Sequence, residues 1–219
     1  MGLYYLHSPG ARDASFEDQV GTLAELRKEG LIRHIGLSNV APEQLRAAVR
    51  ITEVAAVTAY FNVAARQNAA LLRAASDAGA VFCPWQPVSL IRPGVKTDTD
   101  GPAAIRRALE PIAGRHGSTI PQVALAWLLA RSPAILPVPA TTSIAHLREN
   151  LDARDLQLTP EELSAITALA AEDPAAPRNG RLGSRGLQWR RVLGWRVHGA
   201  AGDRGRREGA GDGYGPGVL

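Results

Sequence analysis

The stretch that decides the fold is Gly30-Leu31-Ile32-Arg33-His34-Ile35-Gly36-Leu37-Ser38-Asn39. It opens on a glycine of the kind that ends helices, continues as a short apolar run, and closes on two polar residues. Four other apolar runs are likewise too short for a helix and bounded by turn residues. We therefore predict five strands, at residues 3–7, 34–38, 55–60, 80–84 and 134–137.

Helical signals fill the spaces between these runs. Ser15, with Asp18 three residues later, resembles a capping box, and Gly30 supplies the left-handed residue that ends this helix. A further helix covers about residues 68–78. Other helix boundaries are marked by Pro42, Gly79, Ser118 or Thr119 before Pro121, and Thr159-Pro160-Glu161-Glu162.

Strands that alternate with helices imply successive βα units around a parallel sheet. Such a sheet is either doubly wound or a barrel. No Gly-x-Gly-x-x-Gly follows any of the five runs, so a doubly wound dinucleotide-binding domain is disfavoured. An eight-unit barrel typically needs about 250 residues. We expect an α/β fold, an incomplete (β/α)8 TIM barrel with five recognisable βα units, which lacks about three of the eight units.

Charged residues and glycines are distributed unevenly along the chain. Residues 178–219 hold nine arginines against three acidic residues, a balance of +6, whereas the whole chain carries +4. Residues 1–177 are therefore slightly acidic, at −2. The same segment holds 12 of the 22 glycines and no periodic apolar face. We predict a barrel domain over residues 1–177 and a disordered Arg/Gly-rich tail over residues 178–219.

Composition also bears on partners and compartment. Trp189 and Trp195 alternate with basic residues, which suits RNA or membrane contact, but a solvated extension is favoured and no nucleic-acid partner is expected. No apolar run spans a membrane and the N-terminus lacks a signal peptide's basic region, so we expect a cytoplasmic protein. The single cysteine, Cys83, allows no internal disulfide and favours a small buried hydrophobe over a reactive thiol.

In a barrel the functional groups gather at the carboxyl ends of the strands. These ends carry no acidic cluster, so no divalent-metal site is predicted. A histidine or a Ser-Asn pair at a strand end also serves structural roles. The polar or aromatic residues there are His7, Ser38, Asn39, Tyr60, Asn62, Trp85, Gln86 and, at the start of a helix, Thr141, Thr142 and Ser143.

Four motifs carry a resemblance to a known family. Residues 2–7, Gly-Leu-Tyr-Tyr-Leu-His, resemble the Asp-x-Tyr-x-x-His strand of the aldo-keto reductases, and residues 30–39 resemble their Gly-x-Ile-Arg-x-Ile-Gly-x-Ser-Asn signature. Residues 121–129 and 136–143, followed by Glu149-Asn150, are similar to the family's last barrel helix and its phosphate loop. The resemblance covers about residues 2–173, as the fourth through eighth βα units.

The resemblance implies NADP(H)-dependent reduction of an aldehyde or ketone. Ser38 and Asn39 would hydrogen-bond the nicotinamide carboxamide, and Trp85 would stack on the ring. A helix N-terminus with hydroxyl donors also suits an anion. The adenosine 2′-phosphate would be bound by Thr141, Thr142 and Ser143, with His146 near a position that often holds an arginine, and the adenine by Glu149 and Asn150.

The chain departs from the family at several positions. Gly2, Thr58 and Ala140 stand where the family usually has aspartate, glutamine and glycine. Of the family's catalytic tetrad of Asp, Tyr, Lys and His, only His7 has a counterpart, and we expect no substitute proton donor.

Three hypotheses follow. The leading one is the C-terminal portion of an aldo-keto reductase, a truncated chain inactive alone, which would self-associate through its open barrel edges. The second is a non-catalytic NADP-binding or interaction module with a basic tail. The third is a gene product whose tail is a reading-frame accident.

Overall fold

A computed structural model describes residues 1–7, 14–90 and 101–170. These residues belong to one compact unit, Met1–Gly180. A second unit, Arg181–Leu219, lies outside the described residues, as do the predicted boundary at residue 177 and the predicted disordered tail.

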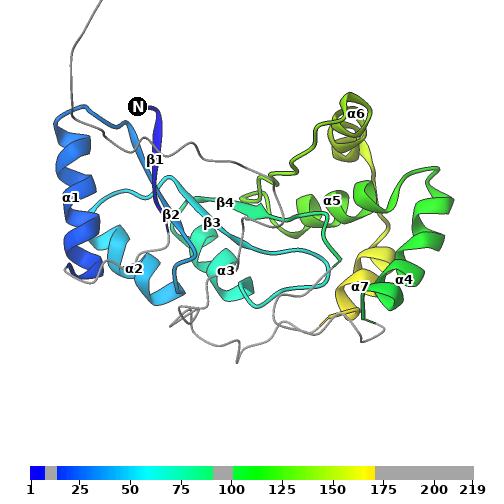
Figure 1. The fold of residues 1–219 in the computed structure, drawn as a ribbon. Coiled ribbons are helices and arrows are strands. Elements are labelled where there is room, and N and C mark those ends of the chain that lie inside the picture. Colours follow the sequence, from blue (N-terminus) through cyan, green and yellow to red (C-terminus); the bar gives the residue numbers. More distant parts are fainter. Residues whose placement is uncertain (8–13, 91–100, 171–219) are drawn as a thin grey trace, which may run out of the picture. The chain divides into compact units, whose positions relative to one another are not determined.

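The described part is an α/β structure around one parallel sheet (Figure 1). The sheet order β1-β2-β3-β4 follows the chain, so each strand pairs with the next. The strands are β1 Leu3–His7, β2 His34–Ser38, β3 Ala56–Tyr60 and β4 Val81–Trp85. Four of the five predicted strands are thus confirmed to within a residue.

Helices follow each strand. The three that connect the paired strands are α1 Phe16–Lys28, α2 Pro42–Ile51 and α3 Ala69–Asp77. The later elements are α4 Gly101–Arg115, α5 Ile120–Arg131, α6 Ile144–Asp152, the single turn η1 Ala153–Asp155, and α7 Pro160–Ala168. None of the helices within the described ranges is both long and apolar enough to cross a membrane.

The local signals in the sequence form as predicted. Ser15 Oγ accepts the Asp18 N–H at 3.0 Å, and the Asp18 carboxylate accepts the Ser15 N–H at 3.3 Å. Gly30 and Gly79 have φ values of +76° and +69°. These left-handed residues end their helices without the strain that a side chain would bring.

The fifth predicted strand, residues 134–137, forms only one isolated bridge beside β4, between Ile135 and Phe82, and a second bridge joins Val138 to Trp85. Phe82 donates its N–H to the Ala134 carbonyl at 2.8 Å, and Leu136 donates to the Phe82 carbonyl at 2.9 Å. The next bond of a parallel ladder would come from residue 84, which is a proline and has no N–H. The segment lies where the sequence predicts it, but Pro84 interrupts the ladder.

The outer edge of β1 is open among the described residues, because β1 pairs only with β2. Leu3 and Tyr4 are 40% and 43% exposed there. At the other end of the sheet Leu136 and Val138 are more than half exposed. Unpaired strand edges favour association, and self-association through them stays a prediction.

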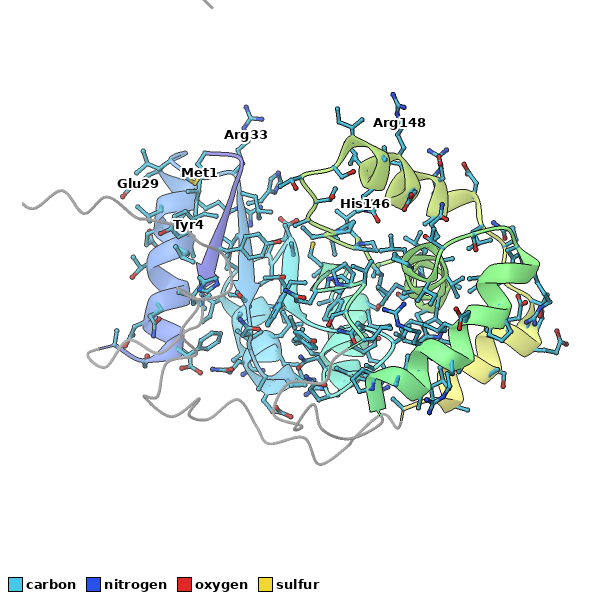
Figure 2. All side chains as sticks on the ribbon, turned by 45° about the vertical axis from the view of Figure 1, so that its right-hand side comes forward. Met1, Tyr4, Glu29, Arg33, His146 and Arg148 are labelled. Carbon is cyan, nitrogen blue, oxygen red and sulfur yellow. The ribbon has the colours of Figure 1, made fainter. Side chains whose placement is uncertain are left out.

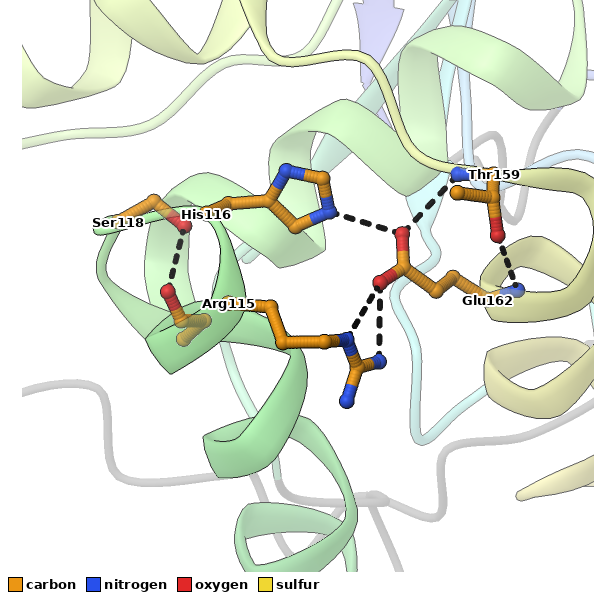
Figure 3. A network of polar contacts seen from close by, with 6 residues as sticks. Arg115, His116, Ser118, Thr159 and Glu162 are labelled. Carbon is orange, nitrogen blue, oxygen red and sulfur yellow. Dashed lines mark hydrogen bonds and ion pairs between the residues drawn. The ribbon is translucent and has the colours of Figure 1, made fainter.

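Glu162 joins α4 to α7 (Figure 3). Its carboxylate accepts the Thr159 N–H at 3.0 Å and the Arg115 Nη2 hydrogen at 2.9 Å, and lies 2.8 Å from His116 Nε2. Hydrogen bonds from the Thr159 backbone and the His116 side chain lower the pKa of Glu162 to about 2. This buried carboxylate is therefore ionised at neutral pH and ties the end of α4 to the start of α7.

A buried cation holds the other end of α7. Arg66, 2% exposed, donates to the carbonyls of Ile166 at 2.6 Å and Ala170 at 2.8 Å, and also to that of Thr167. Its guanidinium lies 4.6 Å from the centroid of the Trp127 ring. The carbonyls that a helix leaves unpaired at its C-terminus are thus satisfied by a charged donor.

Candidate functional site

The carboxyl ends of the parallel strands bring four side chains into one row. His7 is in register with Ser38, Ser38 with Thr58, and Thr58 with Cys83. Residues in register on neighbouring strands point to the same face of the sheet, at a strand spacing of about 4.8 Å. The predicted residues His7 and Ser38 are therefore brought together.

Tyr5 lies one step deeper on the same face. Its ring packs over Gly36, where an added Cβ would stand 2.5 Å from two ring atoms. Its hydroxyl reaches to 3.8 Å from Cys83 Sγ. Burial raises the pKa of Tyr5 far above its ordinary value, and the contact with Cys83 adds to this. Tyr5 therefore lies beneath the row of four side chains, and its hydroxyl is a poor acid.

Asn39 and Trp85 form a second layer above this row. Asn39 has a φ of +54° and donates its backbone N–H to the Thr58 carbonyl at 2.9 Å. The Trp85 indole N–H donates to Asn39 Oδ1 at 3.3 Å, and Asn39 Nδ2 donates to Ser38 Oγ at 3.1 Å. Three residues predicted at the nicotinamide end are therefore joined by hydrogen bonds.

Residues at the ends of β3 and β4 hold this layer in place. The Tyr60 ring meets the Trp85 ring edge-on, with centroids 4.7 Å apart, and its hydroxyl lies 3.4 Å from Ser89 Oγ. Asn62, fully buried, donates to the Gln86 carbonyl at 3.1 Å and accepts two backbone N–H groups. Asn62 was predicted to lie at a strand end, but no role was predicted for it. The only feature of the sequence that could have indicated this role is a polar side chain within an apolar run.

The second predicted cluster opens α6. Ser143 caps this helix by accepting the His146 N–H at 3.3 Å, and Thr141 Oγ1 accepts the Ser143 N–H at 3.1 Å. The first turn of α6 carries no acidic side chain. Its free N–H groups and the exposed Thr142 hydroxyl therefore suit an anion.

The remaining predicted residues lie along α6. His146 is exposed, and Figure 2 shows it on the inner side of α6, opposite Arg148. Glu149 and Asn150 are half-buried in the following turn.

The two clusters stand at the same edge of the sheet. Val138 pairs with Trp85 in a parallel bridge and donates its N–H to the Pro84 carbonyl at 3.3 Å. Thr141 is three residues further on, a reach of at most about 10 Å. A single extended ligand can therefore touch both clusters.

A shallow hollow of about 260 Å³ lies elsewhere, between α5 and α7. Trp127, Arg131, Leu163 and Thr167 are among the residues that line it. It includes no residue from the strand ends, so it is separate from the candidate site.

Comparisons with known proteins point to one family. The model of the aldo/keto reductase family matches residues 1–171. Pyridoxine 4-dehydrogenase of Escherichia coli is 39% identical over 163 residues, which are 74% of this chain and 54% of that protein. An uncharacterised oxidoreductase of Schizosaccharomyces pombe is 36% identical over 153 residues, 68% of this chain and 46% of that protein. The chain spans about half the length of these curated relatives.

Solved structures extend the likeness to the fold. A thermostable aldo-keto reductase in complex with epalrestat is 30% identical, with a TM-score of 0.67 over 78% of this chain and 60% of its own. An aldo-keto reductase from Klebsiella pneumoniae in complex with NADPH is 27% identical, with a TM-score of 0.64 over 80% and 60%. The predicted α/β fold of the TIM-barrel class is confirmed.

Proposed function

The chain belongs to the aldo/keto reductase family, and we propose that it carries the NADP(H)-binding half of an oxidoreductase that reduces an aldehyde or ketone by hydride transfer. Its strand segments correspond to the fourth through eighth βα units of the barrel. The observation that supports the proposal is that two clusters lie at the same edge of the sheet. The first cluster consists of Ser38, Asn39 and Trp85, and the second is the capped start of α6.

We assign the nicotinamide end of the cofactor to the first cluster. NADPH supplies the hydride. Ser38 and Asn39 offer a hydroxyl and an amide for its carboxamide, and the half-exposed Trp85 offers a ring face for stacking. His7, in register with Ser38, orients the substrate carbonyl. The Klebsiella relative solved with NADPH supports NADP(H) as the cofactor.

We assign the adenosine end of the cofactor to the second cluster. Thr141, Thr142 and Ser143 surround the start of α6, where backbone N–H groups and the helix dipole favour a phosphate. His146 lies in the same turn and adds a donor to the 2′-phosphate. Glu149 and Asn150, one turn further, contact the adenine.

A proton donor is missing from this site within the described residues. The Tyr60 hydroxyl is engaged with Ser89, Tyr5 is a poor acid, and the Lys28 amine pairs with Glu25 at 2.7 Å on α1. We propose that this chain alone binds the cofactor without turning over carbonyl substrates. This same observation favours the second candidate function, a non-catalytic NADP-binding module.

Cofactor preference tests the proposal. We expect NADPH to bind at least about tenfold more tightly than NADH, because hydrogen bonds to a charged phosphate are each worth about 1.5 to 3 kcal/mol. Thr142→Val should weaken NADPH several-fold and leave NADH unchanged. Titration of nicotinamide fluorescence measures both.

The matched control is Thr22→Val, which makes the same change on α1 and should leave both affinities unchanged. Equal or tighter binding of NADH by the unmodified chain would refute the proposed 2′-phosphate site.

A further inference from the structure

Asn62 lies fully buried just beyond the end of β3, and the proposed cofactor contacts do not include it. We propose that Asn62 is a positioning residue: its amide holds the turn at Gln86 that follows β4, and thereby fixes the Trp85 ring where the nicotinamide ring stacks. This inference rests on the proposed function of the site. It adds a buried residue that acts on the cofactor only through Trp85.

The Asn62 side chain uses both ends of its amide. Its Oδ1 accepts the backbone N–H groups of Ala64 and Ala65, each at 2.9 Å, and its Nδ2 donates to the Gln86 carbonyl at 3.1 Å. The amide cannot be turned round, because a backbone N–H only donates and a carbonyl only accepts. The oxygen thus stabilises the loop that follows β3, and the nitrogen joins this loop to the turn after β4.

The turn at Gln86 depends on such contacts. Gln86 has a φ of +57°, in the left-handed region, which costs free energy for residues other than glycine. A residue keeps this conformation only where surrounding contacts offset the strain. The Gln86 carbonyl accepts the Ser89 N–H at 3.1 Å from within the turn and Asn62 Nδ2 from the loop after β3. Asn62 therefore ties the strained turn to the neighbouring strand.

This turn begins at the residue next to Trp85. Trp85 is in register with Tyr60, the last pair of the β3–β4 ladder, and the Tyr60 ring meets the Trp85 ring edge-on. Asn62 is two residues beyond Tyr60, so its bond to Gln86 holds the two strands together just past the end of the ladder. The Trp85 backbone is thus fixed on both sides. A ring held in one direction before a ligand binds can stack on that ligand at a lower entropic cost.

The test compares NADP⁺ with 2′-phospho-ADP-ribose, the same molecule without its nicotinamide ring. The unmodified chain should bind NADP⁺ about tenfold more tightly, a factor typical of one flat ring stacked on an aromatic side chain. At pH 8, with its carboxylate ionised, Asn62→Asp keeps the two accepted N–H bonds but removes the donor to the Gln86 carbonyl, so the ratio should fall to within about twofold. A merely structural role would weaken both ligands alike and leave the ratio unchanged.

Trp127→Phe is the control for lost stability. It removes a different buried donor, the indole N–H that donates to Thr167 Oγ1 at 3.1 Å between α5 and α7. This variant should keep the tenfold ratio even where it unfolds more easily. A ratio that persists in Asn62→Asp, or that falls equally in Trp127→Phe, would overturn the proposal while the proposed cofactor function stands.

A second pair of variants tests the turn itself and does not depend on whether Asn62→Asp folds. Gln86 is exposed, so its replacement leaves the core intact. Gln86→Val should lower the ratio as Asn62→Asp does, because a β-branched residue strongly disfavours a positive φ. Gln86→Gly, which adopts this φ without strain, should keep the tenfold ratio. Equal ratios in the two variants would contradict the proposed role of the turn.

Hydrogen exchange in the free chain separates this proposal from the proposed function. The bond to Gln86 should protect the Ser89 N–H, and Asn62→Asp should speed its exchange at least several-fold more than that of the amides in α5. Unchanged relative exchange overturns the positioning role whatever binds. A chain in which Ser89 responds but no NADP⁺ binds refutes the proposed function, and with it the role of Asn62 in cofactor binding.

Discussion

Mixed with NADPH and a reactive aromatic aldehyde, the purified chain is expected to oxidise no more NADPH than a protein-free blank. Hydride delivery builds negative charge on the carbonyl oxygen, and a positioned general acid is worth about 10²- to 10⁴-fold. Electrostatic stabilisation of that oxygen adds about 10²- to 10³-fold per donor. His7 alone can orient a substrate but cannot replace both of these contributions.

His7→Ala should give the same blank-level rate, since orientation without an acid has no reaction to assist. A relative with the complete tetrad, assayed alongside, shows that the aldehyde and cofactor are competent. Clear turnover by this chain that disappears in His7→Ala would contradict this expectation, and would mean that Tyr5, Tyr60 or another group, His7 included, acts as the acid.

Arg66→Met is expected to lower the free energy of unfolding by about 3 kcal/mol. The methionine keeps the volume of the side-chain stem but leaves the buried carbonyl of Ile166 and the partly buried carbonyl of Ala170 without their charged donor. Buried acceptors that lose their partners cost about 1 to 3 kcal/mol each, and part of this cost is recovered where water reaches the end of α7. The midpoint of urea unfolding measures the loss.

Arg154→Met is the control for this change. Arg154 forms an ion pair with Asp155 at 3.0 Å, but its side chain is 80% exposed and solvent screens the pair, so its loss should leave the urea midpoint essentially unchanged. Equal losses in the two variants, or none in Arg66→Met, would show that Arg66 does not hold α7.

Elements with local signals were predictable from sequence. The helices after Ser15, Thr119 and Thr159 begin where their caps indicate, because a capping box involves residues only three apart. Helix α4 was not predicted. It contains Pro111 in its interior and begins at Gly101, and both residue types disfavour a helix when only the local sequence is considered.

Features that depend on distant residues were not predictable. The interruption of the fifth strand comes from Pro84 on a neighbouring strand. The carbonyls on α7 that Arg66 binds lie about 100 residues further along the chain. The burial of this charged residue was therefore not predictable from the sequence. The positions of Ser38, Asn39 and Trp85 at strand ends were predictable, whereas the bond between Asn39 and Trp85 spans 46 residues and needed the fold.

The central claim is that one cofactor spans both clusters, and mapping NADP⁺ binding by ¹⁵N chemical shifts tests it most directly. The account predicts saturable shifts at Ser38, Asn39 and the Trp85 indole, and at the backbone amides that open α6, all with one dissociation constant. Shifts confined to one cluster, located at the hollow between α5 and α7, or absent at saturating NADP⁺ would contradict it.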